Sequence, residues 1–83
     1  MHVTFKDQET GNQVILCVDR EAHHAEAIQA DPDDLRLIQT IAKAMGVETL
    51  YSIVPRADRE KWEAQGWSLT THDVMAVQLI KPK

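Results

Sequence analysis

The segment DPDDLRLIQTIAKAMGVETLYSIV, residues 31–54, decides the fold class of this 83-residue chain. Asp31 can cap a helix, and the polar residues that follow fall on one face, so that the rest of the helix surface is apolar. Gly46 stands where a helix commonly ends in a left-handed residue. The apolar run at 47–54 is typical of a strand. The segment therefore predicts a long helix over residues 33–45, followed directly by a strand.

Short elements flank this segment on both sides. Those before it either alternate apolar and polar residues or run apolar throughout, which is typical of strands, and Gly11-Asn12 suits a hairpin turn between them. Residues 20–30 stay open between an extension of the strand, a loop and a short helix. The expected elements are strands over residues 2–8 and 13–19, a short helix over 57–65, and one bent strand or a terminal hairpin over 67–81.

These elements predict one α/β (α+β) domain that spans residues 1–83. Their order, β-β-α-β-α-β(-β), gives a small mixed sheet of four or five strands. The long helix is expected on one face of the sheet and the short helix on the other. A strand, a long helix and another strand in succession imply a right-handed crossover between parallel strands.

The composition excludes several classes of protein. A net charge of −4 argues against a generic binder of the nucleic-acid backbone, which needs a basic stripe, so no direct nucleic-acid partner is expected. No segment approaches the length of an apolar membrane span, and the first residues lack a signal-peptide pattern. We therefore expect a cytoplasmic protein without a membrane partner.

Cys17 is the only cysteine in the chain. A single cysteine excludes an internal disulfide and fits a reducing compartment. It lies inside an apolar run at residues 14–18, where thiols are usually buried and inert. A buried structural role is therefore predicted for Cys17, in preference to a nucleophile.

Two tryptophans stand out in the stretch KWEAQGW, residues 61–67. If Gly66 is the residue after the helix cap, then Trp67 follows it and Trp62 lies in the last turn of the helix. Side chains at these two positions commonly make an apolar contact in the Schellman arrangement. The pair is therefore predicted to be structural, and ligand binding by either indole is the alternative.

From residue 31 onward, the runs AKAMGVETLYSIV and REKWEAQGW resemble the C-terminal half of a GCN5-related N-acetyltransferase (GNAT) domain. In that family a long helix ends in glycine, a strand follows, and a short helix ends in Gly-Phe or Gly-Trp before the final strands. The resemblance implies a GNAT-like fold. It also implies an acetyl-CoA-dependent N-acyltransferase as one candidate activity.

The chain departs from the family pattern at the cofactor loop. GNAT enzymes bind the pyrophosphate of acetyl-CoA through a glycine-bearing loop before the long helix, whereas this chain has no glycine between Gly11 and Gly46. Carboxylates have the wrong sign for a pyrophosphate at that place. The carboxylates at this helix entrance are Asp31, Asp33 and Asp34.

The second departure concerns the catalytic acid. Many family members carry a tyrosine four residues before the glycine of the short helix, and this chain has Trp62 there, which cannot donate a proton at neutral pH. The resemblance therefore implies a shortened, non-catalytic relative. No catalytic residue and no cofactor are expected, and acetyl-CoA belongs only to the alternative function.

Adjacent histidines at 23 and 24 lie between Glu21 and Glu26, which raises the question of a metal site. Neighbouring residues point to different faces of a strand or a helix, and no second cluster has zinc-like spacing. Solvated histidines are therefore expected, and no metal.

The predicted function is a small non-catalytic protein-interaction module. It would act as an inhibitor or adaptor that binds a larger protein, or itself as a homodimer, through an uncovered sheet face or edge. Accessory proteins of phages and mobile elements, anti-CRISPR inhibitors among them, offer an analogy in size. The alternatives are a minimal acetyl-CoA-dependent N-acetyltransferase and a structural subunit without a ligand. The residues expected to bind a partner are Asp31, Asp33, Asp34, Glu21 and His24.

Overall fold

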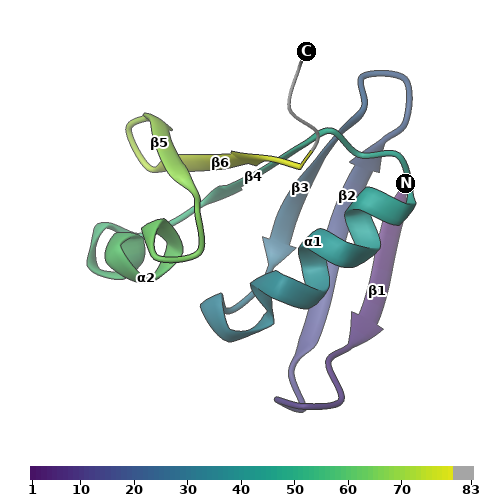
Figure 1. Cartoon of the computed structure of the whole chain (residues 1–83), viewed down its shortest axis with the longest axis horizontal. Coiled ribbons are helices and arrows are strands. Elements are labelled where there is room, and N and C mark those ends of the chain that lie inside the picture. Colours follow the sequence, from purple (N-terminus) through teal and green to yellow (C-terminus); the bar gives the residue numbers. More distant parts are fainter. Residues whose placement is uncertain (80–83) are drawn as a thin grey trace.

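The computed structural model describes residues 1–79, which form one six-stranded sheet and two helices (Figure 1). A short 3₁₀ turn precedes each helix, and no helix in this part of the chain is long and apolar enough to cross a membrane. The strands are β1 (His2–Lys6), β2 (Gln13–Asp19), β3 (His24–Gln29), β4 (Thr49–Ile53), β5 (Ser68–Thr71) and β6 (Val74–Gln78). The helices are α1 (Leu35–Ala44) and α2 (Arg59–Glu63), and the turns before them are η1 (Pro32–Asp34) and η2 (Arg56–Asp58).

The sheet has the strand order β1-β2-β3-β4-β6-β5 and is mixed, as predicted. All neighbours are antiparallel except β3 and β4, which are parallel and are joined through α1. The mixed α+β class is confirmed, but the sheet has more strands than the four or five predicted. Strands β5 and β6 form a hairpin that ends at Gln78, and residues 80 and 81 of the predicted element lie outside the described residues.

The additional strand is β3, in the segment that the sequence leaves ambiguous. Its buried positions are Ala25 and Ala27, and alanine has little preference for strands, so the alternation with His24 and Glu26 is weak. These small side chains lie under α1 and fit between the sheet and the helix. The strand that runs parallel to β4 is therefore β3.

The parallel pair β3 and β4 is short. Only three residue pairs are in register, from His24–Thr49 to Glu26–Tyr51, and the strands then diverge (Figure 1). Beyond that point the hydroxyl of Ser52 donates a hydrogen bond of 2.7 Å to the backbone oxygen of Ala27. The sheet therefore consists of two halves, β1–β3 and β4–β6, joined at one end of β3 and β4.

Both helices pack on the same face of the sheet, so the prediction of opposite faces is wrong. Leu35 and Ile38 of α1 belong to one core cluster with Trp62 of α2. The same face continues from β3 to β4 through the pair Ala25–Leu50, and from β4 to β6 through the pair Ser52–Met75. All four of these residues are buried. The chain after β4 therefore returns to the side that already holds α1.

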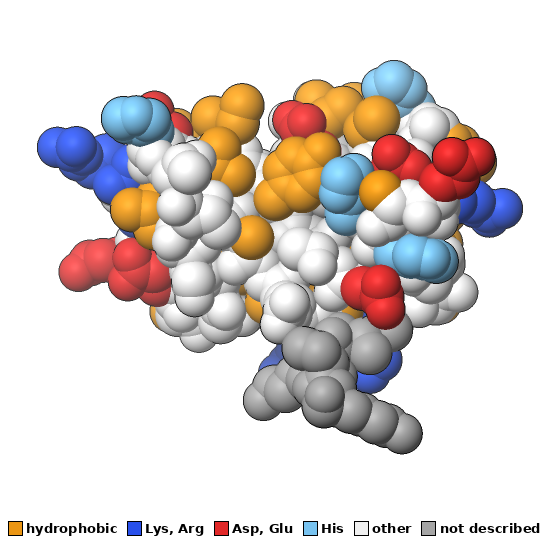
Figure 2. Space-filling model, turned by 90° about the horizontal axis from the view of Figure 1, so that it is seen from above, with side chains coloured by type: hydrophobic (Ala, Val, Ile, Leu, Met, Phe, Trp, Pro, Cys, Tyr) orange, Lys and Arg blue, Asp and Glu red, His pale blue; other side chains and the backbone are white. Residues whose placement is uncertain are grey.

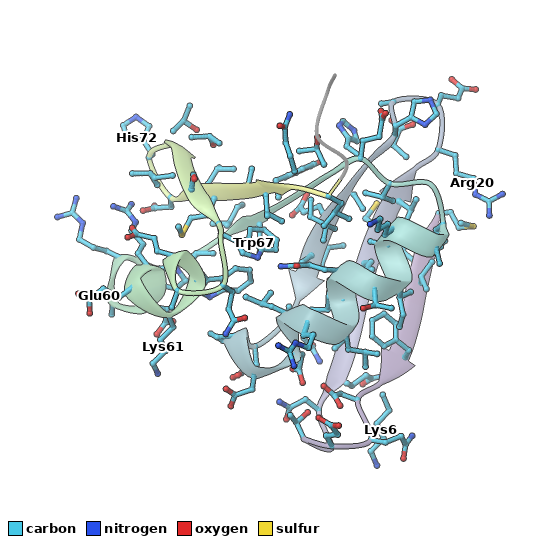
Figure 3. The ribbon with its side chains drawn as sticks, viewed as in Figure 1. Lys6, Arg20, Glu60, Lys61, Trp67 and His72 are labelled. Carbon is cyan, nitrogen blue, oxygen red and sulfur yellow. The ribbon has the colours of Figure 1, made fainter. Side chains whose placement is uncertain are left out.

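The tryptophan pair forms the contact expected across the end of α2. The Trp67 amide donates to the Trp62 oxygen at 3.2 Å, and the two rings meet edge to face with centroids 4.8 Å apart. Gly66 has a φ of 96°, a conformation that side chains with a Cβ rarely adopt. Trp67 points into the molecule and is buried (Figure 3). The pair is part of the core.

We expect Gly66→Ala to destabilise the fold by about 1–2 kcal/mol, the usual cost of a left-handed alanine. A Cβ at residue 66 would meet no atom within 4 Å, so the cost is conformational and not steric. Gly66→Asn is the matched control and should cost less, because asparagine tolerates positive φ better. Urea unfolding followed by tryptophan fluorescence measures both values, and an unchanged Gly66→Ala variant would contradict this role.

Candidate functional site

One face of the sheet carries no helix within residues 1–79, and we call it the open face. Its side chains alternate along each strand with the buried ones, so that their exposure ranges from partial to high. We define the open face by Ile15, Cys17, His24, Glu26, Tyr51, Ile53, Val74 and Ala76. Direct cross-strand pairing places one continuous row on this face, which reads His2, Cys17, Glu26, Tyr51, Ala76 and Ser68.

Apolar side chains dominate the half of the open face that β4 and β6 form. Ile53 is 67% exposed and lies directly opposite Val74, and Tyr51 lies directly opposite Ala76. Seen from above, hydrophobic side chains gather beside histidine and acidic ones (Figure 2). A large aliphatic side chain exposed on a sheet face, next to other apolar groups, is typical of an interaction surface.

Polar side chains border this apolar area where β2, β3 and β4 meet. The His24 ring contacts the Tyr51 ring edge to face, with centroids 5.4 Å apart, and His24 Nε2 lies 3.7 Å from Asp19 Oδ2. Glu26 is paired directly with Tyr51 and Cys17. Burial raises the pKa of Tyr51, and nearby Glu26, Cys17 and Asp19 raise it further. The phenol therefore stays neutral and can donate a hydrogen bond to a bound molecule.

Cys17 belongs to the open face, so the prediction of a buried core cysteine is wrong. The neighbouring Leu16 and Val18 are buried, whereas Cys17 is partly exposed and free. In a strand, neighbouring side chains alternate between faces, and an apolar run at every position hides this alternation. Cys17 is thus a native probe for the occupancy of the open face.

Two of the three acidic residues at the entrance of α1 have structural roles. Asp31 caps the η1 turn by accepting a hydrogen bond of 3.0 Å from the Asp33 amide. Asp34 is fully buried, and its carboxylate accepts hydrogen bonds from Thr10 (2.6 Å) and Asn12 (3.1 Å). The partner-facing role predicted for Asp34 is therefore wrong, because its carboxylate links the β1–β2 hairpin to the helix.

The backbone amides at this entrance are also engaged. Pro32 has no amide hydrogen, and the amides of Asp33 and Asp34 donate to the side chain and the backbone oxygen of Asp31. The Leu35 amide donates to the Pro32 oxygen. The amides of Asp33, Asp34 and Leu35 therefore each have a partner within the turn.

The residues predicted to bind a partner do not form one cluster. Asp31 and Asp33 are exposed at the entrance of α1, and Glu21 is exposed in the turn after β2. Of the five, His24 alone lies on the open face. Sequence reasoning missed Tyr51 and Ile53, because the sequence of the run before Pro55 does not show which of its residues alternate onto the exposed side.

Within residues 1–79 no group of three His, Cys, Asp or Glu side chains is placed to hold a metal ion. Comparison with protein-family models, with curated proteins and with solved structures finds no match to this chain. The open face is therefore the feature of this chain from which a function can be inferred.

Asp34 should make the stability of the fold depend on acid pH. Burial acts to raise the pKa of Asp34, but the hydrogen bonds from Thr10 and Asn12, together with others, hold it below its usual value. The ionised carboxylate thus stabilises the fold above pH about 4, and this contribution is lost as the pH falls through the folded-state pKa. We expect Asp34→Asn to lower the unfolding free energy at pH 7 by about 1–3 kcal/mol.

The Asp34→Asn variant should lose less stability than the wild type between pH 7 and low pH, because it has no carboxylate at position 34 to protonate. Urea unfolding at both pH values measures this difference. Asp33→Asn changes the exposed neighbouring carboxylate and should follow the wild-type pH dependence. Equal pH dependence in Asp34→Asn and wild type would show that Asp34 does not carry the effect.

Cys17 should react with a small thiol reagent in the folded protein. Labelling of a buried thiol requires unfolding and is slower by roughly a thousandfold or more in a domain of ordinary stability. The control is Val18→Cys in a Cys17→Ser background, which moves the thiol to the buried neighbouring position. We expect fast labelling at position 17 and protection at position 18. Equal protection at both would place Cys17 in the core.

Proposed function

We propose that the protein is a non-catalytic interaction module, an inhibitor or adaptor that binds another protein through the open face. The observation that carries this proposal is the apolar area around Ile53, which lies uncovered beside a polar border. Burying an isoleucine side chain contributes roughly 1.5–3 kcal/mol. Several apolar neighbours lie on the same face, so one docking event can bury them together.

The dimensions of the molecule suit such a contact. Its extents are 32 × 31 × 20 Å, as expected for one sheet covered by one layer of helices. Even the narrower sides, which the 20 Å extent and one of the longer extents define, are of the same order as the ~800 Å² that each partner contributes to an interface of standard size. An interface that covers the open face needs no rearrangement of the domain.

The charges around the open face indicate the chemistry of the partner. Asp19 and Glu26 border the apolar area, Glu21 is exposed in the turn beside it, and the chain carries a net charge of −4. A partner that presents apolar side chains flanked by lysine or arginine would match this surface. A second copy packed face to face would bring the same carboxylates and is less suitable, so a different protein is proposed.

The resemblance to the C-terminal half of a GNAT domain remains part of this proposal. It is supported by α1, which ends before Gly46 and β4, and by α2, which ends before Gly66, Trp67 and β5. The arrangement of the helix entrance argues against the acetyltransferase alternative. A pyrophosphate there would meet the exposed carboxylates of Asp31 and Asp33, and the amides of residues 33–35 are already hydrogen-bonded within the turn.

We expect Ile53→Asp to weaken partner binding while the fold is retained. A protein captured by the wild type is purified, and its dissociation constant is measured with each variant. Central apolar anchors commonly contribute 2 kcal/mol or more, so we expect affinity to fall by about 30-fold or more. Leu69→Asp is the matched control, because Leu69 is 48% exposed on β5 and lies outside the open face.

Two further measurements distinguish the alternatives. A partner seated on the open face should slow thiol labelling of Cys17, and the Ile53→Asp variant should lose this protection. Titration of acetyl-CoA should give no heat. A captured protein that binds Ile53→Asp as well as the wild type, or an acetyl-CoA dissociation constant in the micromolar range, would contradict the proposal.

A further inference from the structure

Strand β1 forms one outer edge of the sheet (Figure 1). Half of the backbone groups of such an edge strand face away from its only neighbour, β2. Met1 and Val18 exchange two hydrogen bonds, of 3.0 and 2.7 Å, so they form a hydrogen-bonded pair. Such pairs alternate along an antiparallel ladder. The amides and carbonyls of His2, Thr4 and Lys6 therefore point outward and can pair with another strand.

The two edges of the sheet differ in regularity. The other edge strand, β5, has four residues, and a register shift between Leu69 and Thr71 interrupts its pairing with β6. Shortness and bulges are the usual protections of an edge against pairing with another chain. The ladder of β1 with β2 runs in register from His2 to Lys6 without a bulge. The edge at β1 therefore lacks these two protections.

The sequence of β1, HVTFK, has the same pattern of residue types in both directions around Thr4. In an antiparallel pair of two β1 strands centred on Thr4, each Thr4 lies opposite the Thr4 of the other copy. Val3 then lies opposite Phe5 of the other copy, and both side chains are on the α1 side of the sheet. A strand with this symmetry can pair with itself and keep apolar residues on one face.

A groove of about 500 Å³ lies beside this edge, between the end of β1 and α1. Phe5, Leu37 and Ile41 supply its apolar lining and are only partly buried. In the antiparallel pair, Val3 and Met1 of the other copy lie along this groove on the α1 side. Met1 is 57% exposed in the single chain. The pair would therefore bury apolar side chains that one copy leaves exposed.

We infer that the protein forms a homodimer in which two β1 strands pair antiparallel around Thr4. The two sheets then join into one sheet of twelve strands, and the two-fold axis is perpendicular to it. Because the axis is perpendicular to the sheet at β1, the β1–β3 halves of the two open faces point to the same side. The dimer would present two partner-binding surfaces, and its formation does not depend on what the open face binds.

The first test compares two substitutions at Thr4 by sedimentation velocity over a wide concentration range. Thr4→Pro removes the outward amide hydrogen and should keep the pairing of β1 with β2, because proline is tolerated where an edge amide faces solvent. Thr4→Val keeps the amide. We expect the wild type and Thr4→Val to reach twice the 9.4 kDa chain mass, and Thr4→Pro to stay monomeric with an unchanged circular dichroism spectrum.

The second test needs no substitution, because the single Cys17 can carry a spin label. Cys17 is paired with His2 in the β1–β2 ladder. In the dimer, the Cα atoms of the two Cys17 residues therefore lie about three strand spacings apart across the sheet and about four residues apart along the strands. These two components give a separation of about 20 Å. We expect a distance between labels of roughly 15–30 Å by pulsed electron paramagnetic resonance. A monomeric wild type, a Thr4→Pro dimer, or a distance outside this range would overturn the inference.

Discussion

Three residue pairs between the parallel strands β3 and β4 hold the two halves of the sheet together. Beyond them the strands diverge, and the hydrogen bond from Ser52 to the Ala27 oxygen satisfies a backbone group that the ladder no longer reaches. The same junction brings Tyr51 of β4 beside His24 and Glu26 of β3 on the open face. Ala25 and Leu50, on the other face of the junction, continue the core from one half into the other. The position of the candidate site therefore depends on where these strands pair and where they separate.

The core lies on one side of the sheet because the helices of this short chain are too small to cover both sides. Two helices of ten and five residues can cover one face of six strands but not both, and the tryptophans at the end of α2 complete the same cluster as α1. The open face is left with side chains that a second helical layer would otherwise cover. Burial on one side and exposure on the other is a stable arrangement for an antiparallel sheet when its exposed face is polar. Around Ile53 the exposed face is apolar, and this departure is the reason to assign a function to it.

The sequence predicted the elements whose signals are local and strong. Gly66 with its two tryptophans, the hairpin at Gly11 and the helix that begins after Asp31 agree with the structure because turn and cap chemistry act within a few residues. The strand β3 stayed ambiguous because its buried residues are alanines, and the prediction of helices on opposite faces was wrong because that choice is made by packing. The open face could not be predicted for a related reason. In an apolar run such as β2 or β4, the side that each residue takes is decided by the strands beside it and by the helix above it.

The edge at β1 and the open face use different groups of the same sheet, so occupation of one leaves the other free. Pairing at the edge engages the outward backbone groups of β1 and the side chains of Val3 and Phe5 on the α1 side. Binding at the open face engages Tyr51 and Ile53 on the opposite side and in the other half of the sheet. A dimer therefore offers two equivalent sites, held at a fixed separation by one continuous sheet. Each site can then bind one partner molecule, so that the complex contains two copies of this chain and two of the partner.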